Sequence, residues 1–195
     1  MVIRELYPEE NDKVQAFLLA LNDHDRYRRF GRPMTDEILR QYVSQIDWDD
    51  SVLLGAFDPH AELIGLLELA DVAGACEIAI AVASPHRGRG IGRALMDRAL
   101  LKAKVRGSAR VLLLCQMDNE PMRRLARSAG LHATVDDGEI TGTLDLPQAG
   151  LAEVTEDATR EAIGNATYAM LLGTRAWADL FESAAQTSRH LLPES

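Results

Sequence analysis

A glycine-rich segment lies between a strand-like and a helix-like stretch of the sequence, where it could bind an anion. Residues 87–93 read RGRGIGR, and they follow the apolar residues 75–83 and precede a helical pattern that runs to about Arg106. Glycines let the backbone approach an anion closely, and the N–H groups and positive dipole end of a helix N-terminus attract it. The pattern predicts a phosphate-binding turn, with a glycine-rich turn that binds nothing as the alternative.

The spacing of these glycines excludes two common phosphate-binding motifs. A dinucleotide-binding fingerprint would need a third glycine where Arg93 stands, and an ATP-binding loop would end in Gly-Lys followed by Ser or Thr. Neither pattern is present in residues 87–93. A different sequence pattern within residues 87–93 is therefore needed to identify the ligand of this turn.

Apolar runs and helical patterns around this turn predict one domain of strands and helices. Strands are predicted over residues 2–6, 51–57, 62–70, 75–83, 110–116, 131–135 and 139–146. Helices are predicted after Pro8, after a cap at Thr35, from the glycine-rich turn onward, and after a cap at Asn119. The polar, arginine-rich residues 22–33 are expected to be a connection. The predicted order is βααβββαβαββ.

The sequence changes character at Pro147, and we divide it into a domain of residues 1–146 and a C-terminal helical extension of residues 147–195. Thr155 is expected to cap the long helix of this extension. An apolar stripe follows one side of that helix: Ala162, Ile163, Ala166, Met170, Trp177, Leu180, Phe181 and Ala184. We expect the stripe to pack onto its own domain, with a homodimer or partner surface as the alternative.

Composition narrows the classes of partner. A formal net charge of -9 argues against a nucleic acid, because phosphate backbones are bound through clustered Lys and Arg. No apolar run approaches the roughly 18 residues of a membrane span, and residues 1–7 do not resemble a secretory signal, so a cytoplasmic protein is expected. Cys76 and Cys115 are expected to be reduced core residues, and no Cys or His pair has metal-ligand spacing.

Arg87, Gly90 and Gly92 match the pattern Gln/Arg-x-x-Gly-x-Gly/Ala of the GNAT superfamily of N-acetyltransferases, and the predicted element order resembles that fold over residues 1–146. The resemblance implies an α/β (α+β) fold with a mixed central sheet of about seven strands flanked by helices. It also implies acetyl-CoA as acyl donor, with the coenzyme A diphosphate on the loop amides and pantetheine beside the strand near Val82. The implied donor site comprises Val82, Arg87, Gly88, Arg89, Gly90, Ile91, Gly92, Arg93, Asn119 and Met122.

Within that superfamily the sequence most resembles the acetyltransferase domain of bacterial Pat-type protein lysine acetyltransferases. The matching stretches are residues 25–31 (DRYRRFG), 76–82 (CEIAIAV), 118–131 (DNEPMRRLARSAGL) and 142–146. This resemblance implies a protein lysine as acyl acceptor. A small-molecule amine, or a non-catalytic regulator that binds acyl-CoA, are the alternatives.

Two glutamates are candidates for the general base. An alkyl amine with a pKa of about 10.4 is protonated at neutral pH and must lose a proton before it attacks a thioester. The resemblance assigns this role to Glu77, and an ordinary strand-end carboxylate is the alternative reading. Glu68 is the reserve base, although a solvated strand position suits it better. The amide of Val82 would stabilise the oxyanion that develops on the thioester carbonyl.

Three further residues qualify the mechanism that the resemblance implies. Asn119 is similar to an asparagine that contacts the pantetheine arm, although capping its helix explains it as well. Ala126 stands where many of these enzymes have a tyrosine that protonates the departing thiolate, so water would supply that proton. Cys115 has no neighbouring feature of a nucleophile, which favours direct attack by the amine over an acyl-enzyme.

Overall fold

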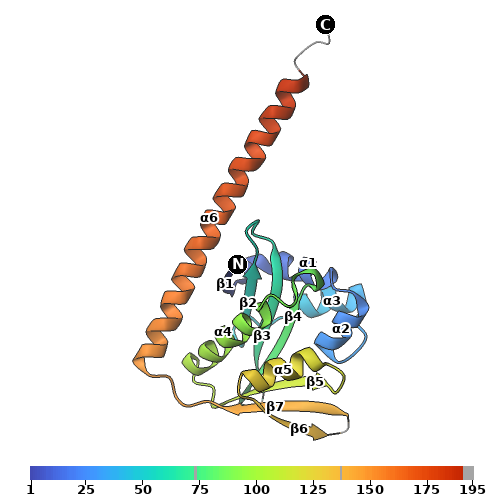
Figure 1. Cartoon of the computed structure of the whole chain (residues 1–195), viewed down its shortest axis with the longest axis vertical. Coiled ribbons are helices and arrows are strands. Elements are labelled where there is room, and N and C mark those ends of the chain that lie inside the picture. Colours follow the sequence, from blue (N-terminus) through green and yellow to red (C-terminus); the bar gives the residue numbers. More distant parts are fainter. Residues whose placement is uncertain (73, 137, 191–195) are drawn as a thin grey trace.

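A mixed seven-stranded sheet organises the molecule in the computed structural model, which describes residues 1–72, 74–136 and 138–190 (Figure 1). The strands are β1 (Val2–Leu6), β2 (Ser51–Phe57), β3 (Leu63–Val72), β4 (Ala75–Val82), β5 (Arg110–Gln116), β6 (His132–Asp136) and β7 (Glu139–Asp145). Their spatial order is β1-β2-β3-β4-β5-β7-β6, and β4 with β5 is the parallel pair among antiparallel neighbours. The predicted α/β fold with about seven strands is confirmed.

Helices cover both faces of this sheet. They are η1 (Pro8–Glu10), α1 (Asn11–Leu19), α2 (Asp23–Phe30), α3 (Asp36–Ser44), η2 (Ser84–His86), α4 (Ile91–Val105), α5 (Glu120–Ser128) and α6 (Leu151–His190). One apolar core lies under α4 and α5, and a second lies under α1 and α3. β3 contributes to both cores, whereas β4 buries its alternate residues Cys76, Ile78 and Ile80 in the core under α4 and α5.

The polar residues predicted to form a connection after α1 contain the helix α2, so that prediction was wrong. Asn22 caps the helix by accepting a hydrogen bond from the Asp25 amide at 2.9 Å, and Gly31, with φ 70°, ends it in the left-handed conformation. Arg26 is 8% exposed and donates to the carbonyl oxygens of Leu19 and Leu21. The helix therefore forms through its end signals and polar contacts rather than through an apolar stripe.

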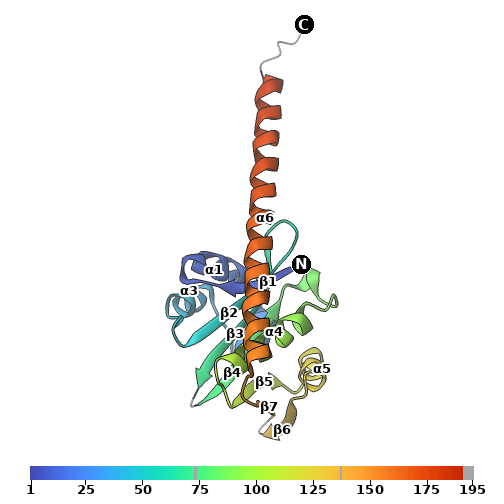
Figure 2. The ribbon, with the colours of Figure 1, turned by 90° about the vertical axis from the view of Figure 1, so that its left-hand side faces the viewer.

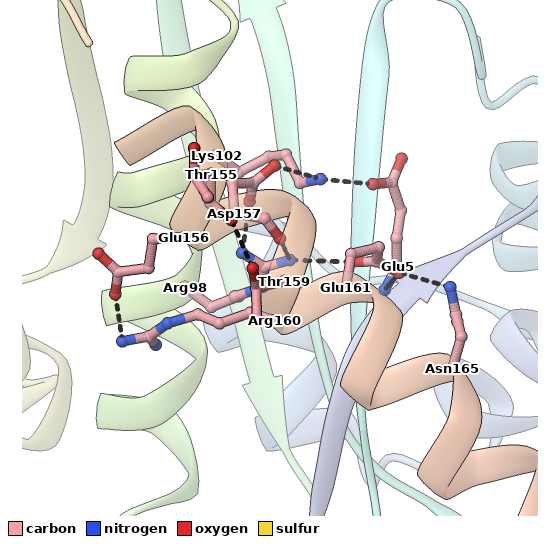
Figure 3. A network of polar contacts seen from close by, with 10 residues as sticks. All are labelled: Glu5, Arg98, Lys102, Thr155, Glu156, Asp157, Thr159, Arg160, Glu161 and Asn165. Carbon is pink, nitrogen blue, oxygen red and sulfur yellow. Dashed lines mark hydrogen bonds and ion pairs between the residues drawn. The ribbon is translucent and has the colours of Figure 1, made fainter. Parts of the chain in front are cut away.

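The long helix α6 docks on the domain through a polar face (Figure 3). Arg98 of α4 is 2% exposed and bonds both the Asp157 and the Glu161 side chains, while Lys102 lies 2.9 Å from Glu5 and 3.1 Å from Asp157. Burial opposes the charge of Lys102, but the hydrogen bonds to Glu5 and Asp157 outweigh it and raise the pKa of that ammonium. The base of α6 is thus held to α4 and β1 by paired charges.

Further along α6, small and aromatic residues continue this docking face. A Cβ atom at Gly164 would lie 2.6 Å from the Ile3 carbonyl oxygen, so only glycine allows the helix to approach β1 so closely. Tyr168 is 6% exposed, and its ring packs 4.4 Å from that of Phe57. Beyond these contacts α6 projects away from the sheet (Figures 1 and 2).

The predicted apolar stripe of α6 faces away from the domain, so the expectation that it packs there was wrong. Ile163 is 61% exposed, Met170 is 71% exposed and Trp177 is 65% exposed. The side chains of Leu180, Phe181 and Ala184 lie outside the described part of the chain. Thr155 was also misassigned as a cap, because α6 begins at Leu151 and the Thr155 hydroxyl donates to the carbonyl oxygen of that residue. No helix within the described ranges has the length and apolarity needed to cross a bilayer.

Candidate active site

The central feature of the site is the point where two parallel strands diverge. All of β4 pairs with β3, from Ala75 opposite Val72 to Val82 opposite Gly65. The ladder between β4 and β5 covers only three residues of each strand within these described segments, and it ends at Ile78 opposite Leu113. The remaining edge of β4 therefore has backbone groups available to a ligand, because it has left its parallel neighbour.

The glycine-rich turn follows directly on this free edge. Gly88 has φ 73° and Gly90 has φ 79°, and Gly90 is the N-cap of α4. A Cβ atom at either glycine would meet open space, so both are required by their backbone conformation and leave room for a ligand. The first amides of α4 have no partner within their own helix, as at every helix N-terminus. The turn thus fits a bound diphosphate.

A first cavity of about 410 Å³ opens beside the turn. Most of the residues predicted to bind the donor line it: Val82, Arg87, Gly88, Gly90, Ile91, Gly92, Asn119 and Met122. Arg89 and Arg93 lie outside this lining, and the Arg93 side chain is instead 2.9 Å from Asp97 on the surface of α4. The structure therefore brings together the loop, the end of β4 and the start of α5.

Two of the lining side chains hold the cavity in shape. The Arg87 Nε donates to the Val82 carbonyl oxygen at 3.0 Å, and its guanidinium lies 2.7 Å from the buried carboxylate of Asp25 on α2. The Asn119 side chain is 5% exposed and accepts from the Met122 amide at 3.3 Å, which caps α5. Arg87 thus joins the turn to β4 and α2, and Asn119 both caps its helix and faces the cavity.

A second cavity of about 130 Å³ adjoins the first at the divergence of the strands. Arg28, Arg29, Ile80 and Met122 line both cavities, so these four residues form the wall where the two meet. Glu77, the predicted general base, lines the second cavity and is half-buried. A donor in the first cavity and an amine in the second would therefore meet at this wall.

The reserve base Glu68 has a different environment from the one predicted, because it is not solvated. Its side chain is 12% exposed, lies 2.5 Å from the Arg29 guanidinium and accepts a hydrogen bond from the Tyr42 hydroxyl. Burial raises the pKa of Tyr42, which keeps that phenol protonated as a donor. Glu68 is thus paired inside the protein, and it lines neither of the two cavities.

The two cysteines are buried, as the sequence predicted. Cys76 and Cys115 are both 4% exposed and unbonded to each other, and burial raises the pKa of each thiol. Although Cys115 lines the second cavity, it is therefore held in the unreactive thiol form. Ala126 is 7% exposed inside the core under α5. Across the described residues, no group of three or more His, Cys, Asp or Glu side chains is arranged to hold a metal ion.

Sequence reasoning missed the contribution of α2 to the site. Asp25, Arg28 and Arg29 all line the first cavity, and the two arginines also line the second. In the sequence, residues 25–31 stand out only through the resemblance to Pat-type domains. The capping residues Asn22 and Gly31 were the available signals of a helix, but nothing local shows that this helix faces β4.

Comparison with known proteins identifies the class to which this fold and site belong. The family described as "Acetyltransferase (GNAT) family" matches residues 16–131, which is more than half of the chain. The protein therefore belongs to the GNAT family of acetyltransferases, whose acyl donor is acetyl-CoA.

Solved structures show the same fold at low sequence identity. The GNAT domain of S. lividans PAT has a TM-score of 0.64 and 23% identity, with 74% of this chain and 89% of that chain covered. Spermidine N-acetyltransferase from Vibrio cholerae, in complex with CoA and spermine, has a TM-score of 0.59 and 19% identity over 73% and 94% of the two chains. The ribosomal-protein-S18-alanine N-acetyltransferase from Escherichia coli has a TM-score of 0.57 and 18% identity, with 76% and 96% covered. Their named acceptors differ, so fold similarity alone leaves the acceptor open.

Proposed function

We propose that this protein transfers an acetyl group from acetyl-CoA to a primary amine, with a protein lysine as the acceptor and Glu77 as the general base. The observation that carries the proposal is the meeting of two cavities where β4 leaves β5. One cavity contains the glycine-rich turn and the other contains Glu77. The layout supports a ternary complex in which donor and acceptor enter from different sides and react at the shared wall.

Donor binding is assigned to the turn and the free edge of β4. The amides of residues 88–93 bind the diphosphate, where the positive end of α4 adds to the attraction. The free edge near Val82 pairs with the pantetheine arm, and Asn119 and Met122 border that arm from α5. The guanidinium groups of Arg89 and Arg93 are exposed and lie outside the cavity lining. These two residues therefore bind the donor only through their backbone amides.

Acetyl transfer then follows by direct attack. Glu77 accepts a proton from the substrate ammonium, and the neutral nitrogen bonds to the carbonyl carbon while negative charge develops on its oxygen. The Val82 amide stabilises that charge, a contribution typically of about 3 kcal/mol for one such donor. The carbon–sulfur bond breaks and the nitrogen releases its second proton to water. Water also protonates the departing thiolate, because Ala126 offers no acidic group. The protonated state of Cys115 supports direct attack over an acyl-enzyme.

The acceptor is tested by incubating the purified protein and acetyl-CoA with a cell lysate and with a panel of amines, followed by mass spectrometry. Acetylated lysines are expected. An acetylated metabolite without modified lysines would replace the protein acceptor by a small molecule. Tight coenzyme A binding without any product would make the protein a non-catalytic regulator.

Donor binding is tested separately with Gly90→Glu. A side chain there is strained at φ 79° and places a negative charge beside the diphosphate, so calorimetry should detect no acetyl-CoA binding. Gly107→Glu, at φ 80° in a turn after α4, is the matched control because it carries the same strain away from the cavity. Unchanged affinity in a folded Gly90→Glu protein would place the donor elsewhere.

We further propose that residues 1–146 form the catalytic domain and that the extension of residues 147–195 forms a homodimer through α6. The exposed side chains of Ile163 and Met170, seven residues apart, share one side of α6, turned by roughly 100–140° around the helix axis from the docked residues Asp157 and Gly164. Sedimentation should give twice the mass of one chain, and Ile163→Glu with Met170→Glu should halve it. A monomeric wild type would contradict the dimer. A cytoplasmic location stays a prediction of the sequence.

A further inference from the structure

The second cavity is bordered by buried polar atoms that lack partners. The Nε atoms of Arg28 and Arg29 and the Oε1 atom of Gln116 are buried, and none has a hydrogen-bond partner within the described protein. All three side chains line the cavity that contains Glu77. Buried polar groups in folded proteins nearly always have a partner, in the protein or in water, and these three lie where a molecule that enters the cavity can supply one.

The two arginines differ in how well their charges are neutralised. Arg29 has a side chain that is 5% exposed and lies 2.5 Å from the Glu68 carboxylate, so its charge is matched. Arg28 has Asp118 as its carboxylate partner, at 4.0 Å, and that side chain is 73% exposed. An ion pair at this distance and exposure is weak. Arg28 therefore leaves a positive charge beside the second cavity.

The position of these groups relative to Glu77 indicates which substrate they meet. A base must lie within hydrogen-bond reach of the proton that it removes, so the acceptor amine occupies the cavity of Glu77. The Arg28 and Arg29 N–H groups border the same space as donors, and the Gln116 carbonyl oxygen borders it as an acceptor. An acceptor that matches them offers an anionic oxygen and an N–H group close to the reacting nitrogen.

We propose that this cavity selects amine acceptors that carry a carboxylate close to the reacting amine, with Arg28 as the group that recognises it. The proposal rests on the acetyl transfer assigned above and narrows its substrate class. For a protein acceptor, the target is a lysine beside an acidic residue. A polyamine carries only positive charges near its amines, and Arg28 repels it.

The test compares two lysine peptides that differ only in a Glu or a Gln next to the lysine, with acetyl-CoA as donor. The wild type is expected to have at least a tenfold higher kcat/KM for the Glu peptide, an effect of the size that one charge-assisted contact gives. The Arg28→Gln variant should show no preference, and Arg28→Lys should restore part of it. Arg127→Gln removes an exposed arginine on α5 outside both cavities and controls for net charge, so its preference should match that of the wild type.

Other outcomes overturn the proposal in distinct ways. Equal rates for both peptides in the wild type, or a preference that persists in Arg28→Gln, would remove Arg28 as the selecting group. A second arm replaces acetyl-CoA by succinyl-CoA. A preference for the succinyl donor that Arg28→Gln abolishes would place the carboxylate on the acyl group instead of on the acceptor.

The proposed function can fail separately from this inference. If no peptide or amine is acylated, the transfer activity is wrong, and calorimetric titration of the two peptides into the coenzyme A complex decides the inference. Tighter binding of the Glu peptide that is lost in Arg28→Gln would support it, and equal or undetectable binding would overturn it. Thermal melting of each variant verifies that it is folded.

Discussion

Two clusters of charged residues, one beneath α6 and one beside Glu77, are built from similar side chains but are paired to different extents. Beneath α6, both terminal nitrogens of Arg98 bond to Asp157 and Glu161, and Lys102 bridges Glu5 and Asp157 (Figure 3). In the active-site cluster, by contrast, Arg28 has a distant and exposed carboxylate partner, Asp118 at 4.0 Å, and its side chain lines a cavity.

This difference separates a structural role from a binding role. Charges that neutralise one another in a buried interface fix the position of α6, and they offer nothing to a ligand. A charge that has no close partner beside a cavity can interact favourably with a bound substrate of opposite charge. Substitutions in the first cluster should therefore change stability, and substitutions in the second should change acetylation.

The largest effect is expected for Asp157→Ala. The change removes the carboxylate shared by Arg98 and Lys102, so two buried cations lose a partner, and the free energy of unfolding should fall by about 3–5 kcal/mol. Chemical denaturation measures this loss. Glu156→Ala is the control, because Glu156 forms an exposed pair with Arg160 one turn away and should cost about 0.5 kcal/mol or less. Equal losses in the two variants would show that the buried cluster does not hold α6.

Glu77→Gln should lower turnover by about 100-fold or more, which corresponds to about 2.7 kcal/mol in the activation barrier. Glutamine keeps the size of the side chain but cannot take a proton from the ammonium. The affinity for acetyl-CoA and the free energy of unfolding should stay at the wild-type values, in contrast to Asp157→Ala. Steady-state kinetics and calorimetry on the same preparation separate these quantities.

Glu68→Gln supplies the comparison for that experiment. Glu68 pairs with Arg29 and Tyr42 inside the protein, so its amide variant should lose stability more than turnover. If Glu68→Gln loses turnover while Glu77→Gln keeps it, the two roles are reversed. If neither variant loses turnover, neither of these carboxylates acts as the base, and the equilibrium of the substrate's own amine is enough.

Most of the fold could be read from the sequence because its strands are apolar runs and its main helices have apolar faces. The exceptions have a common physical cause. α2 and the docking face of α6 are stabilised by polar contacts, such as the Arg26 bonds to backbone carbonyls and the Arg98 pair with Asp157. Hydrophobic periodicity carries no signal for such contacts. The close approach at Gly164 also depends on where β1 lies, which no local pattern records.

The glycine-rich turn was predictable from spacing, because backbone conformation imposes glycine at Gly88 and Gly90. The two-cavity arrangement was not, since it depends on how far the ladder between β4 and β5 continues before it ends at Ile78. The arginines of α2 reach the site only through tertiary packing. Spacing thus predicts the glycine-rich turn and the resemblance predicts Glu77, whereas the arginines of α2 become visible at the cavities only in the structure.

The smallest expected effect is a pH dependence of the unfolding free energy that arises from Glu10. This residue lies near the contact between Lys13 and Tyr168 of α6. Glu10 lies 2.5 Å from Arg4 and 2.7 Å from Lys13, and Lys13 in turn donates to the Tyr168 hydroxyl of α6 at 3.0 Å. Burial works against the charge of Glu10, but the hydrogen bonds from Arg4 and Lys13 outweigh it and lower its pKa from the ordinary value of 4.5.

A carboxylate whose pKa is lowered by folding stabilises the folded state at pH values above its ordinary, unfolded-state pKa. This contribution is lost as the pH falls through the folded-state pKa. The difference in unfolding free energy between the wild type and Glu10→Gln should therefore be present at pH 6 and shrink as the pH falls below 4.5. Subtracting the variant removes the titration of the other carboxylates from the comparison. Denaturant midpoints measured at pH 6 and at successive acidic values give this difference. A difference that stays constant over that range would mean that Glu10 contributes through its shape and not through its charge. The contact at Tyr168 would then differ from the cluster beneath α6, where paired charges hold the helix.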